Sequence, residues 1–416
     1  MVLHKKEDTD KMAISELKRY KLRMQVLLYL YTKSLQSALS LSKKIHVSLP
    51  TVRSILDDLI EEKIIRIAGM GNSKGGRRPI LYSHANDAYY ILAIELGHYN
   101  GKAQLFNSLN HEISTVHEFS TNINDPKLEE HIDKILNDLT QEAKLEKNKI
   151  AALGISMPGL IDAKNGLNRT IKNPEYRNVK QRLSARFKIP VYIENDARMQ
   201  ALGEFVFGKA KNTQNTLVLN WDWGLGLGMI LNGQIYQGSN GSAGEFSHIR
   251  LSQEGKLCRC GKQGCLETIA SAEVLIEMAQ EAIKQGATSQ LTRLFSKTPE
   301  QLKVSDIIQC AQNGDELSIS LLNKLGTRLA WGLSILIQLY NPELIVLNGP
   351  LIKAHKFILI PIQQTLNQYC LENIINNVEL EISEMGEHSG LKGVSVMVFQ
   401  KIFRDKSADP PAHSQN

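Results

Sequence analysis

Long apolar runs and a signal-peptide core are both lacking in this sequence. No apolar stretch approaches the ~18 residues that are needed to span a bilayer. The first residues, MVLHKKEDTDK, lack the apolar core of a secretory signal. We therefore expect a cytoplasmic protein that does not insert into membranes. A disorder-promoting composition is lacking too, because 42% of the side chains are apolar, so the 416 residues suffice for two or three domains with their own cores.

Cysteine is scarce, with five residues in the whole chain. In a reducing cytoplasm, so few thiols argue against a disulfide framework. Three of the five nevertheless fall within eight positions, at Cys258, Cys260 and Cys265. Such clustering indicates a metal site. The alternative is a group of buried, reduced thiols beside an unrelated histidine.

Excess charge of either sign is absent from most of the chain. The net charge is +6, but residues 1–90 carry 16 Lys and Arg against nine Asp and Glu, whereas the remaining residues carry 33 against 34. The positive excess therefore lies in the first fifth of the sequence. A basic head on a neutral body predicts binding to a polyanion, and a solubilising charged surface is the alternative.

The basic region has the apolar pattern of consecutive short helices. The first helix is expected to begin near Ile14 and to bury residues at helical spacing, namely Leu22, Val26, Tyr29 and Leu30. Ser37 is expected to cap a second helix that buries Leu41 and Ile45. His46 and Val47 then form the turn. This spacing is typical of the first two helices of a helix-turn-helix.

A third helix is indicated by Ser48 as its cap and Pro50 in its first turn. Its buried stripe is expected to consist of Val52, Ile55, Leu56, Leu59 and Ile60. In a helix-turn-helix, the exposed start of this helix meets the major groove of DNA. The residues expected there are Ser48, Leu49, Thr51, Arg53 and Ser54.

Two strands, at residues 64–68 and 77–82, flank the turn-rich loop GMGNSKGG. They predict a β-wing in which Lys74, Arg77 and Arg78 contact phosphates or enter a narrow minor groove. The alternative is a packing module with a solvated loop. Together with the positive charge, the pattern favours a winged helix-turn-helix over residues 13–87, after a flexible N-terminus at 1–12, that binds double-stranded DNA.

The body of the chain, residues 88–405, has an α/β pattern with an internal echo. The segments YYILAIELGHYNGKAQLFN and NTLVLNWDWGLGLGMILNGQIY each read as strand, glycine-containing turn and strand. They suggest two related lobes with a cleft between them, although such hairpins are common enough for coincidence. Residues 406–416 are expected to form a disordered tail.

The segment GSAGEFSHIRLSQEGKLCRCGKQGCLETIAS resembles the central signature of the ROK family, which groups repressors with sugar kinases. The resemblance runs from the helix-turn-helix to LKGVSVMVF and implies a two-lobed actin/hexokinase-like (ribonuclease H-like) sugar-kinase domain. It also implies one structural zinc ion per chain, held by His248, Cys258, Cys260 and Cys265. The chemistry agrees, because one imidazole and three thiolates close a tetrahedron with no open position, and glycines at 261 and 264 permit a tight loop.

The same resemblance implies a sugar site. The segment IENDARMQALGE matches one that supplies an Asn–Asp pair. The implied sugar contacts are Asn195, Asp196, Glu245, His248 and Glu267. Carboxylates and an amide suit the many hydroxyls of a sugar, while capping or surface roles are the alternative for any one of them. SMPG at 156–159 and Asn173 match segments lining the cleft, whereas Arg198 and Ser247 depart from the common Asn and Gly.

The phosphate loops of the family's kinases are altered in this chain. Residues 95–99 read ELGHY in place of an Asp-x-Gly-Gly-Thr turn, and residues 224–228 read GLGLG in place of a Gly-Thr-Gly loop. The missing hydroxyls and acidic group help to place a phosphoryl group and Mg²⁺. The remaining glycines are weak evidence for ATP, because tight hairpins need them anyway. We therefore expect no enzymatic activity.

The expected function is that of a ROK-family repressor that responds to a sugar or sugar phosphate. Homodimers, or tetramers of paired dimers, are expected from the symmetry of operator half-sites. Sugar in the cleft would change the angle between the lobes and so the spacing of the heads. An ATP-dependent sugar kinase with an appended helix-turn-helix is the alternative, and a head that contacts a protein partner is a third.

Overall fold

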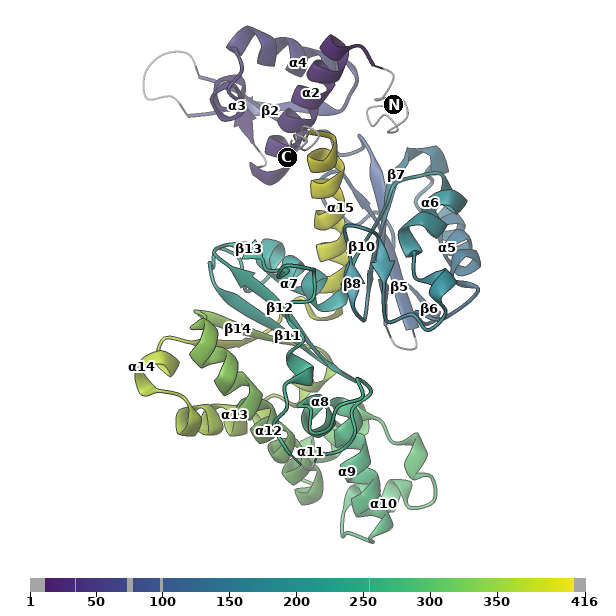
Figure 1. Ribbon diagram of the computed structural model, residues 1–416, viewed down its shortest axis with the longest axis vertical. Coiled ribbons are helices and arrows are strands. Elements are labelled where there is room, and N and C mark those ends of the chain that lie inside the picture. The colour runs from purple at the N-terminus through teal and green to yellow at the C-terminus, as the bar shows by residue number, and fades with distance from the viewer. Residues whose placement is uncertain (1–11, 34, 73–77, 98–99, 254, 408–416) are drawn as a thin grey trace, which may run out of the picture. The chain divides into compact units, whose positions relative to one another are not determined.

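The computed structural model describes residues 12–33, 35–72, 78–97, 100–253 and 255–407. The chain divides into two compact units, which are coloured by residue number in Figure 1. The first unit consists of Met1–Glu194 and Val394–Asn416, and the second of Asn195–Gly393. The chain therefore crosses between the units at Glu194–Asn195 and again at Gly393–Val394. None of the described helices is long and apolar enough to cross a membrane.

The N-terminal head contains helices α2 (Ile14–Lys33), α3 (Ala38–Ile45) and α4 (Leu49–Glu61). The Ser37 hydroxyl accepts a hydrogen bond from the Ser40 amide at 3.1 Å, and the Ser48 hydroxyl accepts one from the Thr51 amide at 3.4 Å. His46 ends α3 in the left-handed conformation, with φ 54°. The predicted caps and turn are therefore confirmed.

Helix α2 buries a different stripe from the predicted one. Its buried residues are Tyr20, Met24, Val26, Leu27 and Leu30. Val26 and Leu30 of the predicted stripe are therefore buried, and Leu22 and Tyr29 are half-buried. The reason is that α2 packs against both α3 and strand β3, which a single periodic stripe does not anticipate. Ile45 and Ile60, in the last turns of their helices, are likewise half-buried.

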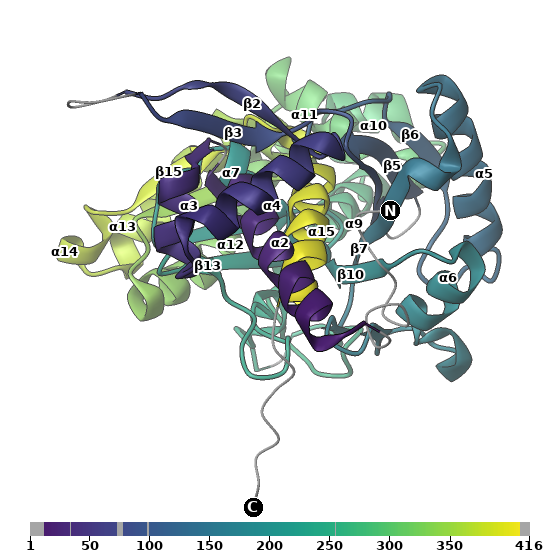
Figure 2. The ribbon, with the colours of Figure 1, turned by 90° about the horizontal axis from the view of Figure 1, so that it is seen from above.

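The head also contains an antiparallel sheet in the order β1-β3-β2, formed by β1 (Gln36–Ser37), β2 (Ile65–Met70) and β3 (Ile80–His84). Strands β2 and β3 form the expected hairpin (Figure 2). Strand β3 begins at Ile80, later than predicted, because Pro79 has no amide hydrogen to donate. Lys74 and Arg77 lie outside the described residues, and Arg78 is exposed.

The rest of the first unit is built on a sheet of the strands β4 (Tyr90–Leu96), β5 (Asn100–Asn107), β6 (His117–Ser120), β7 (Ile150–Met157) and β10 (Val191–Asn195), in the order β10-β7-β4-β5-β6. Strands β4 and β5 pair antiparallel, and β4 and β7 pair parallel. Apolar residues of α5 (Leu128–Glu142) and α6 (Val179–Phe187) pack on this sheet. A small ribbon, β8 (Ile161–Asp162) and β9 (Leu167–Asn168), follows β7.

The second unit repeats this topology with β11 (Thr216–Trp221), β12 (Leu225–Leu231), β13 (Gln234–Ile235), β14 (Leu344–Asn348) and β15 (Glu379–Ile382), in the order β13-β12-β11-β14-β15. Again a hairpin, β11 with β12, is followed by a parallel partner, β14. Both predicted hairpins are therefore confirmed, and the shared strand order shows that their echo is not coincidence.

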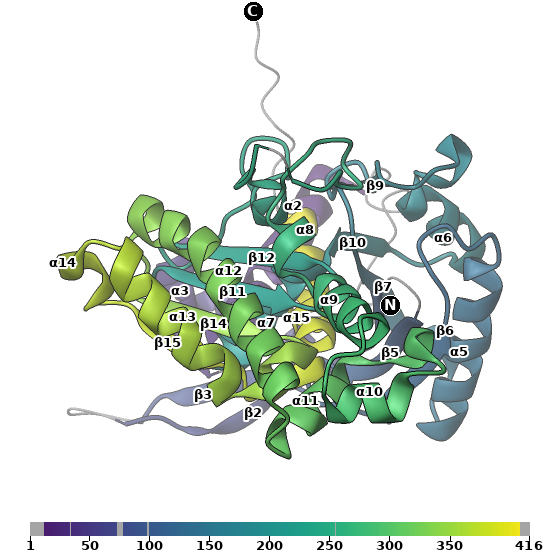
Figure 3. The same ribbon diagram turned by 90° about the horizontal axis from the view of Figure 1, so that it is seen from below.

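Helices cover both faces of the second sheet. Helix α7 (Asp196–Phe207) packs on β11 and β12. On the other side, α12 (Glu316–Tyr340) and α13 (Lys356–Tyr369) lie side by side (Figure 3). The core between α12 and the strands includes Trp221, Leu329 and Leu347. The shorter helices are α8 (Glu267–Ala270), α9 (Ala272–Lys284), α10 (Gln290–Phe295), α11 (Val304–Gln312) and α14 (Glu372–Ile375).

The last helix, α15 (Ser389–Ser407), is continuous across the second crossing between the units. It ends two residues into the stretch that was expected to be a disordered tail, and residues 408–416 lie outside the described residues. A Cβ atom on Gly154 of β7 would lie 2.3 Å from a methyl carbon of Val398. Glycine at 154 therefore lets α15 approach the first sheet closely.

Candidate functional site

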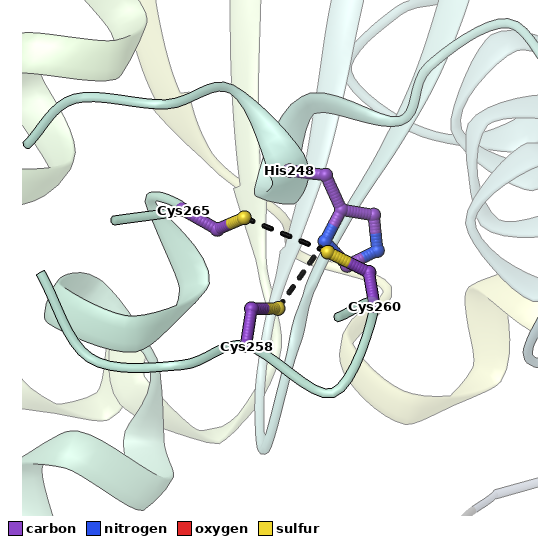
Figure 4. A group of neighbouring side chains, drawn as sticks. All are labelled: His248, Cys258, Cys260 and Cys265. Carbon is purple, nitrogen blue, oxygen red and sulfur yellow. Dashed lines mark hydrogen bonds between the residues drawn. The ribbon is translucent and has the colours of Figure 1, made fainter. Parts of the chain in front are cut away.

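The predicted zinc ligands converge in the second unit (Figure 4). The ligand atoms of His248, Cys258, Cys260 and Cys265 all lie within 4.8 Å of one another. The sulfur of Cys258 is 3.6 Å from Nδ1 of His248, and the sulfurs of Cys260 and Cys265 are 3.7 Å apart. The three cysteines are free thiols that form no disulfide. The sequence therefore identified a real cluster, and Nδ1 is the imidazole atom that faces the thiols.

These distances fit a tetrahedral zinc ion. Zinc lies about 2.3 Å from a thiolate and about 2.0–2.1 Å from an imidazole nitrogen, so tetrahedral geometry separates two sulfurs by about 3.8 Å and a sulfur from a nitrogen by about 3.6 Å. The sulfur–sulfur separation of 3.7 Å and the sulfur–nitrogen separation of 3.6 Å match these two values. The four residues can thus hold a metal ion such as zinc.

Glycines permit the loop to bring the ligands together. Gly261 and Gly264 have φ angles of 84° and 76°, which side chains with a Cβ rarely adopt. A Cβ on Gly264 would also lie only 1.9 Å from the Ser252 carbonyl oxygen. The loop is tied back by bridges that join Arg250 to Cys265 and Leu257 to Gln263. The predicted role of both glycines is confirmed.

The candidate sugar residues lie next to this cluster. Nε2 of His248, on the ring edge away from Nδ1, is 3.9 Å from the Glu245 carboxylate. Burial raises the pKa of Glu245; His248 and Arg198 oppose this shift, while Asp196 and Glu267 add to it. All of these groups are therefore close enough to Glu245 to influence its charge. The structure brings together acidic and polar side chains from segments up to 71 positions apart in the sequence.

Secondary structure places each of these residues at the end of an element. Asn195 ends β10 and caps α7, where its side-chain oxygen accepts a hydrogen bond from the Arg198 amide at 3.2 Å. Asp196 is the first residue of α7, and Glu267 is the first residue of α8. A Cβ on Gly224 would lie 3.1 Å from a Glu267 carboxylate oxygen. Glu267 therefore borders the turn between β11 and β12.

Arg198, which the sequence marked as a departure from the family's common Asn, is buried beside the candidate site. Its side chain is only 3% exposed, and its guanidinium donates a hydrogen bond to the Gly241 carbonyl at 2.6 Å. It also lowers the pKa of Glu245 against the effect of burial. A buried cation beside several carboxylates offsets their mutual repulsion. The sequence signal was the arginine itself, at a position where the family commonly has Asn.

Two glycines of the segments compared with kinase phosphate loops lie where a helix packs on a strand. Gly226 and Gly228 lie within β12, and a Cβ on them would meet the Ala197 Cβ at 2.8 Å and the Ala201 Cβ at 2.4 Å, respectively. Within the β11–β12 hairpin, these glycines therefore also make room for α7. Glu95 lies in β4 of the first unit, and residues 98–99 lie outside the described residues.

Two segments that were matched to the cleft belong to the first unit. Ser156 lies in β7, and Gly159 follows it with φ 109°. Asn173 caps a 3₁₀ turn, where its side-chain oxygen accepts a hydrogen bond from the Glu175 amide at 3.1 Å. Asn173 therefore has a structural role as a cap.

The residues predicted to contact DNA differ in accessibility. Ser48, Arg53 and Ser54 are exposed, while Leu49 and Thr51 are half-buried. The Ser54 hydroxyl accepts a hydrogen bond from Arg19 of α2 at 3.0 Å, and the same guanidinium is 2.5 Å from Asp58. Ser54 is therefore engaged at the seam between α2 and α4, and a DNA contact there competes with Arg19.

Known proteins match this chain over most of its length. A xylose repressor from Caldicellulosiruptor bescii is 27% identical over 387 residues, which make up 92% of this chain and 96% of the relative. The DNA-binding transcriptional dual regulator NagC of Escherichia coli strain K12 is 26% identical over 357 residues, 85% of this chain and 86% of that protein.

The fold is matched by a solved ROK family transcriptional regulator, a homolog of the Escherichia coli Mlc protein, with a TM-score of 0.78. That structure shares 24% identity and covers 93% of this chain and 98% of its own. The sequence model of the ROK family matches residues 91–401, which is well over half of the chain. The chain therefore belongs to the ROK family.

Proposed function

We propose that this protein is a DNA-binding transcriptional repressor that responds to a sugar. The observation that carries the proposal is the extent of the matches. The family model begins at residue 91, but the xylose repressor match covers 92% of the chain and must therefore include most of the head. Relatives that share both parts are regulators, so the head is the part of the chain that we assign to DNA.

The head has the chemistry for this role. Residues 1–90 carry a net +7, and α4 presents Arg53 at its exposed N-terminal turn. We assign residues 13–87 to the winged helix-turn-helix and 88–405 to the effector and dimerisation domain. Within the head, Ser48, Leu49, Thr51, Arg53 and Ser54 read the major groove, while Lys74, Arg77 and Arg78 contact the backbone or minor groove.

The effector site is assigned to Asn195, Asp196, Glu245, His248 and Glu267. His248 serves two purposes, because Nδ1 faces the thiols while Nε2 faces Glu245. A zinc ion bound to Nδ1 fixes the ring and so orients Nε2 toward the ligand. The relatives are named for xylose and N-acetylglucosamine, so a pentose or hexose derivative, with or without phosphate, is the class of effector that we propose.

Repression requires that the sugar act on the DNA-bound state. A ligand shifts such an equilibrium only through its different affinities for the two states. Two protomers bound to a palindromic operator provide the symmetric arrangement in which head spacing matters. We therefore propose a homodimer, alone or paired into a tetramer.

The competing function is that of an ATP-dependent sugar kinase, for which Asp196 is the candidate general base. The altered residues 95–99 and 224–228 argue against it. Purified protein is mixed with ATP, Mg²⁺ and D-xylose, D-glucose or N-acetylglucosamine in a coupled assay, with Asp196→Asn as the control. We expect no turnover; turnover that Asp196→Asn abolishes contradicts the assignment.

The repressor function is tested by binding to DNA from upstream of the chain's own gene. We expect salt-sensitive binding that is tighter than to a scrambled duplex, and that D-xylose or N-acetylglucosamine weakens it. A thermal-shift screen of sugars and sugar phosphates identifies the effector independently. Equal affinity for both duplexes at every salt concentration contradicts the repressor assignment.

A further inference from the structure

The end of α2 and the end of α15 meet in an aromatic cluster within the first unit. The cluster consists of Tyr31, His84, Tyr89, Phe399 and Phe403. The ring centroids in contact are 5.4 to 6.2 Å apart, and the phenylalanine side chains are fully buried. Rings at these separations add attraction beyond the burial of apolar surface. The head therefore packs on the C-terminal helix rather than hanging from a linker.

One side-chain oxygen joins three distant segments beside this cluster. Oδ1 of Asn110 accepts a hydrogen bond from the Tyr31 hydroxyl at 2.8 Å and another from the Ser395 hydroxyl at 3.0 Å. Tyr31 belongs to α2 of the head, Asn110 follows β5, and Ser395 belongs to α15. A single amide thus connects the head to the first sheet and to the last helix.

The backbone at Asn110 suits this role. Its φ angle is 61°, a left-handed conformation that asparagine adopts more readily than most residues. The backbone amide of Asn110 donates a hydrogen bond to the Asn107 carbonyl at 2.9 Å, which fixes the turn. The backbone therefore places the Asn110 side chain within reach of the two hydroxyls.

The polar atoms of the cluster are also satisfied. Nε2 of His84 donates to the Leu27 carbonyl at 2.9 Å, which requires the neutral tautomer with hydrogen on Nε2. Nδ1 then accepts a hydrogen bond from the Tyr89 hydroxyl at 2.6 Å. A buried network with partners at both ring nitrogens is rigid and costly to open.

The other end of α15 is held in the second unit. A Cβ on Gly393 would lie 1.7 Å from the Met199 carbonyl of α7, and one on Gly203 would lie 2.1 Å from the Ser389 carbonyl. The amide of Asn348 also donates to the Ser389 hydroxyl at 2.8 Å. The start of α15 therefore packs directly on α7, the helix that begins at Asp196.

We propose that Asn110 is a positioning residue that fastens the head to α15, so that the head follows this helix. Helix α15 then connects the element that begins at the effector site to the DNA-binding head. The inference goes beyond the proposed function because it names the route between the two sites. The test below needs neither sugar nor DNA, so its result does not depend on the repressor assignment.

Hydrogen exchange of the full chain, followed by mass spectrometry, tests the fastening. Asn110→Gly removes the side chain without straining a backbone at φ 61°. Loss of two hydrogen bonds is expected to speed exchange about tenfold in the second half of α2 and in residues 394–403. Asn110→Asp retains the accepting oxygen and is expected to restore slow exchange. Asn212→Gly, at an exposed residue with φ 70°, is the matched control and is expected to leave both segments unchanged.

The segments in which exchange accelerates distinguish a positioning role of Asn110 from a general loss of stability. Helix α5, whose apolar residues pack on the same sheet, is expected to keep its wild-type rate. Tyr31→Phe removes one of the two hydroxyls and is expected to produce a smaller acceleration in the same two segments. Unchanged exchange in α2 and α15, or equal acceleration throughout the first unit including α5, would overturn the proposal.

Discussion

His248 and Glu245 face each other across 3.9 Å, with Nε2 of the imidazole toward the carboxylate and Nδ1 toward the cysteine thiols. One ring therefore separates the candidate metal cluster from the candidate sugar contacts. A metal ion bound at Nδ1 would fix the orientation of the whole ring and thereby the direction of Nε2. Loss of the metal is thus expected to affect both folding and ligand binding.

Metal analysis of the purified protein is expected to find about one zinc per chain. Cys258→Ser is expected to reduce this content to near zero and to lower the thermal midpoint, because the binding free energy of a structural zinc contributes to folding. Cys310→Ser is the matched control, since Cys310 is also buried but lies outside the cluster. It is expected to retain the zinc. A metal-free wild type that is fully folded contradicts the zinc assignment.

Arg198→Asn introduces the residue that is common in the family and removes a buried cation. The Gly241 carbonyl loses its partner, and the Glu245 carboxylate loses a nearby positive charge. We expect a loss of about 1–3 kcal/mol in the free energy of unfolding at pH 7.

The pH dependence of this variant gives a second readout. The pKa of Glu245 is already raised in the folded protein, so the folded state holds its proton at a pH where the unfolded chain has released it. The raised pKa of Glu245 therefore lowers the stability of the folded protein as the pH rises from the ordinary pKa of a glutamate to the raised one. Without Arg198 the pKa of Glu245 is expected to rise further, so Arg198→Asn is expected to lose more stability than the wild type as the pH rises above the ordinary pKa of a glutamate. Arg198→Lys keeps the charge, so its loss of stability with pH is expected to lie between those of the wild type and Arg198→Asn. Urea unfolding at several pH values measures the stability of all three proteins.

Arg53→Ala is expected to weaken binding to DNA from upstream of the gene by about 1–3 kcal/mol if the side chain reads a base. Arg77→Ala with Arg78→Ala is instead expected to weaken binding to every sequence and to reduce the salt dependence by about one unit of slope per lost phosphate contact. Fluorescence anisotropy over a range of salt concentrations distinguishes the two effects. Arg293→Ala, on an exposed face of α10, is the control and is expected to change neither. An unchanged affinity in the double variant removes the wing from the DNA-binding surface.

Acid is expected to weaken the junction between the head and α15 through His84. Burial lowers the pKa of His84 to about 4, against an opposing hydrogen bond to the Leu27 carbonyl. The ordinary value is about 6.5. Between these values the unfolded chain binds the proton and the folded chain does not, so stability is present above pH 6.5 and is lost as pH falls toward 4.

From pH 7 to pH 5 the expected loss due to His84 is about 2 kcal/mol. Urea unfolding monitored at pH 7, 6 and 5 measures it. His84→Gln has no proton to gain and is expected to flatten the pH dependence, even though it lowers stability at pH 7. His111→Gln, at an exposed position, is the control and is expected to retain the wild-type slope. Equal slopes in wild type and His84→Gln contradict the prediction.

Local patterns in the sequence were sufficient to determine the short-range features of this protein. Ser37 and Ser48 cap their helices as predicted, because a cap depends on residues three positions away. The cysteine spacing predicted a metal site, the family resemblance added His248 to it, and the four side chains form a cluster that can hold a metal ion. The paired hairpins followed from strand periodicity and glycine turns.

Only the tertiary structure decided the relationships between distant residues. The burial of Arg198 beside Gly241, the room that Gly226 and Gly228 make for α7, and the contact of Asn110 with both Tyr31 and Ser395 all join segments far apart in the chain. Periodicity reports which face of an element is buried but not what lies against it. The wider stripe of α2 shows the same limit, since burial on a second face depends on where β3 packs.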